Sequence, residues 1–159
     1  MDSYTCIGKS VGAIIQNKDG EILMIDRVHE PFGWACPAGH VEEDKGFKEP
    51  FRGSLDMEVS EEVGLKVLSA EMVLEETVSW NNCRRSTEGH HWRVYEVLEV
   101  GEYEEISINN AGYIEARGYG WFKPEELEHL ELEPVWRYFL EKLGYIGEPK
   151  GGMHLKKVS

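Results

Sequence analysis

The chain has 159 residues, which is enough for one domain whose core needs no disulfides or structural metal. Its 30 acidic and 17 basic residues give a formal net charge of −13, which opposes loose binding to nucleic acids or anionic membranes. The odd count of three cysteines is typical of free thiols in a reducing compartment, and the longest early apolar run, at residues 11–15, is too short for a signal peptide or membrane span. We therefore expect a cytoplasmic protein.

Three strands are predicted before the middle of the chain. Residues 10–16 and 21–26 are rich in β-formers, and Asp19-Gly20 between them is typical of a hairpin turn. Residues 34–36 read as a short third strand, and the segment after it reads as a loop because Pro37 and Gly39 favour a turn.

A helix is predicted over residues 50–63. Pro50 suits the first helical turn, where its missing N–H is not needed, and Gly64 suits a left-handed C-terminal cap. At helical spacing, one apolar stripe is formed by Phe51, Leu55, Val59 and Val63. This stripe indicates that one face of the helix packs against a core.

The second half of the chain predicts two more strands and two helices. The strands cover residues 65–77 and 91–100, with a polar surface loop between them. Residues 106–120 read as irregular, and a short helix begins at Pro124. A final helix over residues 134–143 has one apolar face.

These elements predict one α+β domain over residues 1–146, a sandwich with a mixed sheet between helices. From residue 147 onward the sequence is basic and Gly-rich with no apolar period, so we expect a flexible tail over residues 147–159.

Three acids gather on the helix at residues 50–63. Glu58, Glu61 and Glu62 stand at i, i+3 and i+4, so they meet beside the apolar stripe. An acidic helix surface is the simple alternative, since like charges cost an exposed helix only about 0.2–0.5 kcal/mol per pair. At an effective dielectric near 20, charges about 4 Å apart repel by about 4 kcal/mol, so a partly buried trio calls for a cation. Oxygen ligands on a rigid helix suit Mg²⁺ or Mn²⁺.

A zinc site is a second metal hypothesis. It would draw on widely spaced residues, namely Cys36, His40, Cys83, His90 and His91. Since no two of them have the spacing of a zinc finger, the sequence favours the carboxylate site.

The segment PAGHVE at residues 37–42, together with the acidic helix, resembles the box of the Nudix (MutT-type) hydrolases. That box is a Gly, five residues, Glu, seven residues, then Arg-Glu-apolar-x-Glu-Glu-x-Gly-apolar. Here Glu49 is followed by seven residues and then by MEVSEEVGL at residues 57–65, so the helical half matches in register. The resemblance implies a Nudix-type α/β/α sandwich over about residues 11–143.

Two departures from the box stand out. Nine residues rather than five separate Gly39 from Glu49, which indicates a four-residue insertion that should bulge without moving the helix. Met57 also replaces the arginine that pairs with the first box Glu in the family. Glu49 is therefore expected to lose its partner, for which Arg52, one turn away, is a candidate substitute.

The resemblance implies a metal-dependent hydrolase that cleaves a phosphoanhydride bond of a nucleoside diphosphate-linked compound by water attack on phosphorus. A nucleoside triphosphate or related nucleotide is favoured, because residues 65–88 lack the Pro or Tyr that marks subfamilies acting on ADP-ribose or dinucleoside polyphosphates. The alternative is a catalytically weak nucleotide-binding or sensor module, which the loss of the box arginine would favour. A third option, chemistry like that of isopentenyl-diphosphate isomerase, lacks a matching catalytic cysteine.

The resemblance also assigns roles to single residues. Glu58, Glu62 and the carbonyl of Gly39 are the expected metal ligands, and Glu61 is either a ligand or the base for the attacking water. Glu115 lies six residues before Trp121 in the irregular segment, where several Nudix enzymes place an extra acid that binds metal or acts as base; an ordinary solvated loop residue would look the same.

Contacts to the substrate are predicted from four further residues: Arg27, Trp34, Arg84 and Arg85. The arginines fit distal phosphates, but lone arginines also fit plain surface charges. A tryptophan can stack on a base or line a core. The sequence is compatible with a homodimer and implies a small-molecule nucleotide partner, with no membrane and no long nucleic acid.

Overall fold

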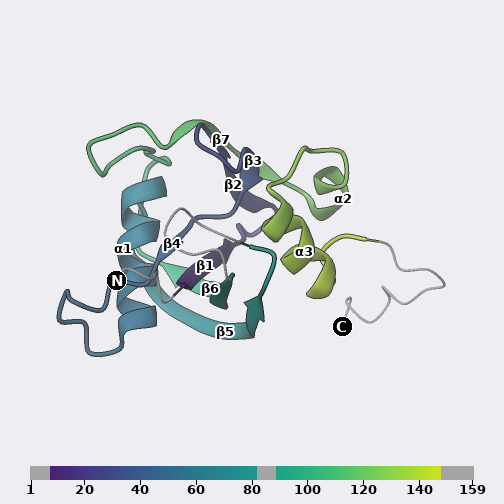
Figure 1. Cartoon of the computed structure of the whole chain (residues 1–159). Coiled ribbons are helices and arrows are strands. Elements are labelled where there is room, and N and C mark those ends of the chain that lie inside the picture. The colour runs from purple at the N-terminus through teal and green to yellow at the C-terminus, as the bar shows by residue number, and fades with distance from the viewer. Residues whose placement is uncertain (1–7, 82–88, 148–159) are drawn as a thin grey trace.

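The computed structural model describes residues 8–81 and 89–147. Strands form the middle of the molecule, with helix α1 (Pro50–Val63) on one side and helix α3 (Pro134–Lys142) on the other (Figure 1). A short helix α2 (Pro124–Leu127) precedes α3. The predicted α/β/α sandwich is confirmed, and α1 has the predicted bounds. Within the described residues no helix has the length and apolarity to cross a bilayer.

The strands form two sheets. The larger sheet has the order β4-β1-β6-β5 and consists of β1 (Lys9–Ile15), β4 (Ala38–His40), β5 (Val67–Val78) and β6 (His90–Val100). It is mixed, because β1 and β6 run parallel whereas the other two pairs are antiparallel. The smaller, antiparallel sheet has the order β3-β2-β7 and consists of β2 (Ile22–Arg27), β3 (Gly33–Ala35) and β7 (Ala116–Phe122).

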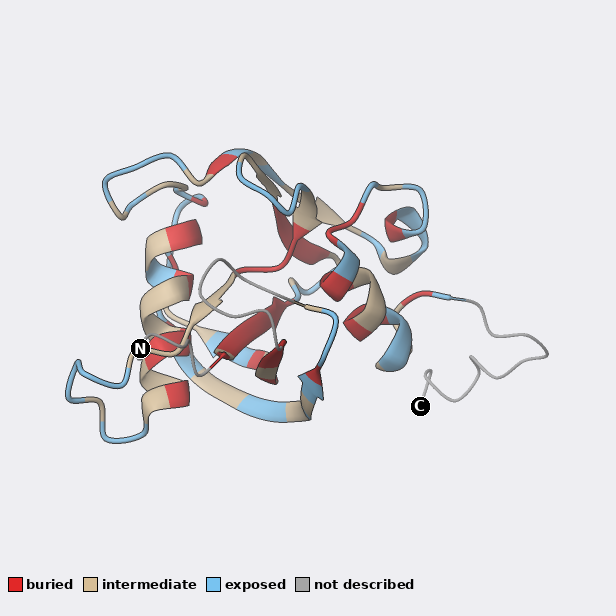
Figure 2. Ribbon diagram, in the orientation of Figure 1, coloured by how far each residue is buried: buried red, intermediate tan, exposed pale blue. Residues whose placement is uncertain are grey.

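The core has two parts, one under each helix. Alternate strand residues point to opposite faces: Val11 and Leu23 belong to the cluster that includes Leu55 of α1, whereas Ile14 belongs to the cluster that includes Trp136 of α3. We call these the α1-side cluster and the α3-side cluster. Buried residues accordingly lie on the helix faces turned toward the strands (Figure 2). All four residues of the predicted apolar stripe are buried.

The predicted hairpin between the first two strands is wrong. Asp19-Gly20 does form a turn, in which the Gly20 N–H donates to the Asn17 carbonyl at 3.0 Å. The two segments beside this turn are joined by a single β-bridge, between Gln16 and Ile22. Beyond that bridge β1 and β2 diverge into different sheets. A tight turn thus connects two sheets rather than two paired strands.

Two strands lie where the sequence indicates loop. The three residues of β4 fall in the Pro- and Gly-containing segment after β3, and β7 begins inside the region 106–120 that reads as irregular. Gly118 and Gly120 weaken the strand propensity of β7. Its pairing with β2 along the whole strand overrides that local preference.

The inserted loop before α1 is attached to the helix at both ends. The Glu42 N–H donates to Ser54 Oγ at 2.8 Å, and the half-buried Phe47 packs on Gly53. A Cβ at position 53 would lie 2.2 Å from the Phe47 ring, so the ring covers the helix where a side chain is missing. The insertion therefore bulges while α1 keeps its bounds, as predicted.

Candidate active site

Helix α1, which carries the box acids, is capped at both ends. At its start, the Glu49 carboxylate accepts the Phe51 and Arg52 N–H groups, both at 3.3 Å. At its end, Gly64 adopts the left-handed conformation with φ 72°, and its N–H donates to the Ser60 carbonyl at 3.0 Å. These caps satisfy backbone groups that have no partner within the helix. The acids between them stand on a rigid support.

Glu58, which is half-buried, and Glu62, which is buried, form a carboxyl pair one helical turn apart. The two side chains hydrogen-bond each other, and Glu62 is only 7% exposed. Glu62 also accepts the Ala38 N–H at 3.1 Å, which ties α1 to β4. Burial raises the pKa of Glu58 to about 8 and that of Glu62 well above its usual range, and repulsion between the two adds to the shift at Glu62. Both carboxyl groups are therefore harder to ionise than exposed glutamates.

Gly39 of β4 lies directly against the Glu58 carboxyl group. A Cβ at position 39 would lie 2.2 Å from Glu58 Cδ and 2.3 and 2.6 Å from its two oxygens. Only glycine leaves room for the carboxyl group at this place. The structure thus brings together two predicted metal ligands from separate elements.

Glu115, immediately before β7, joins the same cluster. Its negative charge raises the pKa of both Glu58 and Glu62, after burial as the main cause. Its Oε1 is buried without a hydrogen-bond partner. A hydrogen bond to Glu115 and its charge raise the pKa of Tyr113 to about 12. Glu115 is therefore not a solvated loop residue.

Glu61 completes the group of acids at its edge. It is half-buried, and its charge contributes to the raised pKa of Glu58. The other predicted acids, Glu61, Glu62 and Glu115, thus all act on Glu58.

The donor set fits a divalent cation. Within residues 8–81 and 89–147, no three His, Cys, Asp or Glu side chains already form a metal cage. Glu58 and Glu62 instead lie within hydrogen-bonding reach of each other, and burial raises the pKa of both. A hard cation would stabilise these crowded carboxyls and the unpaired Glu115 oxygen. Because every donor is oxygen, Mg²⁺ and Mn²⁺ suit the site better than a soft metal.

Glu49 has a cationic partner that the sequence did not indicate. The Arg93 Nη1 atom of β6 lies 3.7 Å from Glu49 Oε1. Arg52, the predicted substitute for the box arginine, pairs with Asp56 at 2.9 Å and reaches Glu49 only through its backbone N–H. Glu49 thus lacks the box arginine, and the cation beside it is Arg93 rather than the predicted Arg52.

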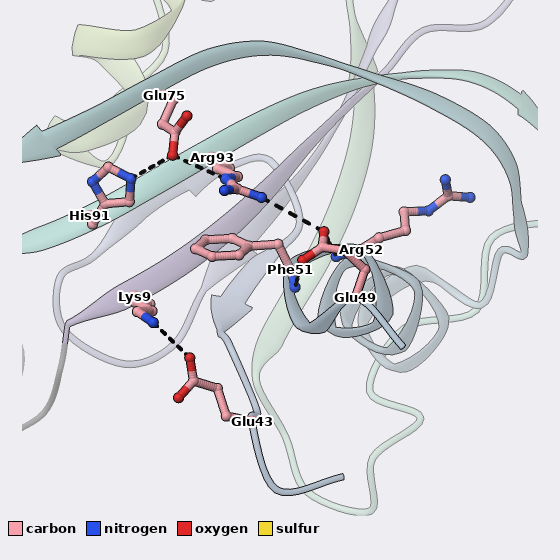
Figure 3. A network of polar contacts seen from close by, with 8 residues as sticks. All are labelled: Lys9, Glu43, Glu49, Phe51, Arg52, Glu75, His91 and Arg93. Atoms are coloured by element: carbon pink, nitrogen blue, oxygen red, sulfur yellow. Dashed lines mark hydrogen bonds and ion pairs between the residues drawn. The ribbon is translucent and has the colours of Figure 1, made fainter. Parts of the chain in front are cut away.

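Arg93 is itself held by its neighbours. Its Nε donates to Glu75 of β5 at 3.1 Å, and its guanidinium lies 4.1 Å from the centre of the Phe51 ring (Figure 3). His91 shares the same Glu75 oxygen at 2.8 Å. This network attaches the start of α1 to the edge of the larger sheet. The only signal for it in the sequence was the alternation of β6, which does not identify a partner on α1.

Two of the predicted substrate contacts lie on β2 and β3. Arg27 donates to the carbonyls of Pro31 and Glu30 at 2.6 and 3.3 Å, so its guanidinium holds the loop before β3. Trp34 is half-buried and packs edge-on against Phe122, with ring centroids 5.1 Å apart. Arg84 and Arg85 lie outside the described residues.

The zinc hypothesis gains no support from the described residues. Cys36 is buried in the α3-side cluster, where burial raises the pKa of its thiol. His91 bonds Thr77 and Glu75 on β5, each at 2.8 Å. Cys83 lies outside the described residues. His40 and His90 do lie against each other, with ring centroids 5.3 Å apart. Within the described parts of the chain, however, no three His, Cys, Asp or Glu side chains are placed to hold a metal ion.

Glu133, just before α3, is a buried acid that the sequence did not single out. Burial raises its pKa from 4.5 to about 7, and Arg27, 3.9 Å away, offsets only part of that shift. The unfolded chain releases this proton above about pH 4.5 while the folded protein keeps it to about 7, so stability falls as pH rises through this window.

Glu133→Gln, which cannot ionise, is expected to raise the free energy of unfolding at about pH 8 by about 1–2 kcal/mol, with little change at about pH 5. Urea unfolding at both pH values measures this difference. The exposed Glu131→Gln is the matched control and should follow the wild type. An unchanged pH dependence in Glu133→Gln would contradict the assignment.

Acids from one helix lie beside a glycine of β4 and an acid before β7, as the resemblance to the Nudix box predicts. The NUDIX domain model matches residues 7–143, so the chain belongs to the Nudix hydrolase family. Similar curated proteins are the nucleoside triphosphatase NudI of Escherichia coli O139:H28 (strain E24377A / ETEC) and that of Shigella flexneri. Each is 28% identical over 141 residues, covering 84% of this chain and 94% of the relative.

Solved structures with the same fold include the MutT protein from Methanosarcina mazei Go1. It has a TM-score of 0.63 and 23% identity, and the match covers 85% of this chain and 91% of that one. Another is the NUDIX domain of Shewanella oneidensis NrtR complexed with ADP ribose, with a TM-score of 0.67, 15% identity and coverage of 90% and 91%. At these identities the likeness shows the fold.

Proposed function

We propose that the protein is a divalent-metal-dependent pyrophosphohydrolase whose substrate is a nucleoside triphosphate or a related nucleotide. The observation that carries the proposal is the cluster of Glu58, Glu62 and Glu115, in which the Glu58 carboxyl lies against Gly39 and one Glu115 oxygen is buried without a partner. The nucleoside triphosphatase relatives support the choice of substrate class.

In this proposal Glu58, Glu62, Glu115 and the Gly39 carbonyl hold Mg²⁺ or Mn²⁺. When bound, the ion would neutralise phosphate oxygens and favour ionisation of the attacking water. Because burial raises the pKa of Glu58 and Glu62, metal binding at these carboxyls competes with protons. The net charge of −13 repels a polyphosphate, so the substrate approaches only where local cations reverse that sign.

Glu61 is the proposed base. It lies at the edge of the cluster, where its carboxylate is accessible to water, and would take the proton as the water oxygen attacks phosphorus. The bridging P–O bond then breaks, and the leaving phosphate or pyrophosphate carries away the bonding electron pair. Arg84 and Arg85 remain predictions for contacts to the distal phosphates, and Trp34 for the base.

A binding-only module is the second candidate. It is favoured by the hydrogen-bonded Glu58 and Glu62 pair, since these side chains are not already arranged as a cage, and by Met57 in place of the box arginine. The Arg93 contact to Glu49 weakens this alternative, because it supplies a cation beside the glutamate with which the box arginine would pair.

A substrate panel separates the two candidates. We expect phosphate or pyrophosphate release from nucleoside triphosphates only when Mg²⁺ or Mn²⁺ is added, with lower rates for nucleotide sugars, ADP-ribose and dinucleoside polyphosphates. Glu62→Gln serves as the inactive control. Silence across the panel, with nucleotides still raising the melting temperature, would favour the binding module.

A further inference from the structure

The loop between β6 and β7 is attached to the C-terminal end of α1. Asn110 provides this attachment: its N–H donates to the Glu61 carbonyl at 2.8 Å, and its Nδ2 to the Ser60 and Glu61 carbonyls at 3.3 and 3.2 Å. The Ser107 N–H adds a bond to the Val63 carbonyl at 3.2 Å. Carbonyls in the last turn of a helix lack partners within it, so the loop caps the helix that carries the box acids.

Asn109, the next residue back, joins the loop to the start of β7. It has φ 61° and is the only non-glycine residue with positive φ in the described parts of the chain. Its Oδ1 accepts the N–H groups of Glu115 and Ala116 at 2.8 and 3.0 Å, and its Nδ2 donates to the Ala116 carbonyl at 2.9 Å. Asparagine tolerates this left-handed conformation better than most residues. The Asn109 side chain thus bonds the backbone of Glu115 and Ala116 as a neighbouring strand would.

A β-bulge sets the direction of the chain at the same point. The register of β7 on β2 shifts at Arg117, whose Nε lies 3.1 Å from Asp26 Oδ2. Ala116 and Trp121, five residues apart, would face opposite sides of a regular strand, yet both contact the α1-side cluster. Bulges are known to redirect side chains in this way.

The Glu115 carboxylate needs such restraint. It is held near Glu58 and Glu62, which repel it, and one of its oxygens is buried without a partner. A free loop would turn the carboxylate out to water. Its N–H is fixed by Asn109, and its carbonyl accepts the Val28 N–H at 3.1 Å.

We propose that Asn109 is a positioning residue that holds Glu115 in the metal site, with Asn110 tying the same loop to the helix of the other acids. This inference rests on the proposed function, and it adds a residue that touches neither metal nor substrate. Groups that orient metal ligands commonly contribute 10–100-fold to metal affinity.

Asn109→Gly tests the role, because glycine keeps the left-handed backbone and removes only the side-chain bonds. Titration calorimetry of the full chain with Mn²⁺ alone should show an affinity about tenfold lower or worse. Glu115→Gln should lower it similarly, and the double variant should fall no further, because both changes remove the same contribution.

Two matched variants complete the design. Asn17→Gly removes the same kind of hydrogen bonds, because Asn17 Oδ1 accepts the Asp19 and Glu21 N–H groups at 3.0 and 2.9 Å. This variant should leave Mn²⁺ affinity unchanged. Asn109→Asp keeps the accepting oxygen and is expected to stay near the wild type. An equal loss in Asn109→Asp and Asn109→Gly would contradict the role of Oδ1.

The outcomes also separate this inference from the proposed function. Wild-type affinity in Asn109→Gly, or a full further loss on top of Glu115→Gln, would overturn the positioning role alone. A wild-type protein that binds no Mn²⁺ would overturn the metal site and this inference together.

Discussion

Glu62→Gln is expected to lower metal-dependent turnover by about a hundredfold or more while raising the thermal stability of the metal-free protein at neutral pH. The loss of activity follows from removing a proposed ligand. The gain in stability follows from the raised pKa of Glu62: the unfolded chain releases this proton above about pH 4.5, whereas the folded protein keeps it to a much higher pH. Stability therefore falls as pH rises, and a glutamine avoids that loss.

Turnover and melting temperature, measured on the same preparations, check both parts of this prediction. The exposed Glu125→Gln on α2 is the control and should change neither. In Glu62→Gln the amide oxygen of the new side chain can still accept the Ala38 N–H, so the link between α1 and β4 is retained. A variant that lost stability together with activity would show that Glu62 is a structural residue.

Gly39→Ala is expected to reduce turnover by about a hundredfold with little effect on the fold. The new methyl group would lie 2.2 Å from Glu58 Cδ, so the carboxyl group must move. A displacement of about 1 Å in a catalytic group can cost about 100-fold in rate. The fold should survive, because the clash is with the end of a side chain rather than with backbone.

Kinetics and circular dichroism measure this second effect. Gly118→Ala in β7 is the matched control, since a Cβ there would meet no atom within 4 Å. Unchanged turnover in Gly39→Ala would mean that Glu58 acts from another position than the one in this structure.

Local rules were sufficient for the box helix. Pro50 and Gly64 mark its two ends, and its apolar residues recur at helical spacing, so its bounds and its buried face were predictable from neighbours within a few residues. The same periodicity placed Glu58, Glu61 and Glu62 on one side of the helix. Hydrophobic strands and two helices also sufficed for the sandwich.

Pairing between distant segments could not be predicted in the same way. β4 and β7 have glycines and weak strand propensity, and only their partners β1 and β2 stabilise them as strands. The Asp19-Gly20 turn is local, but whether the strands beside it pair depends on which other strands are available. Strand pairing is a long-range property, so propensity alone does not decide it.

The sequence by itself therefore determined the family, the helix and the order of its acids, because these depend on residues close together in the chain. Only the tertiary structure decided that Glu115 reaches those acids, since its position depends on Asn109 and on the bulge at Arg117. Only the tertiary structure decided that Arg93 pairs with Glu49. Both contacts join segments that are brought together by packing of the sheets against α1, which no local pattern encodes.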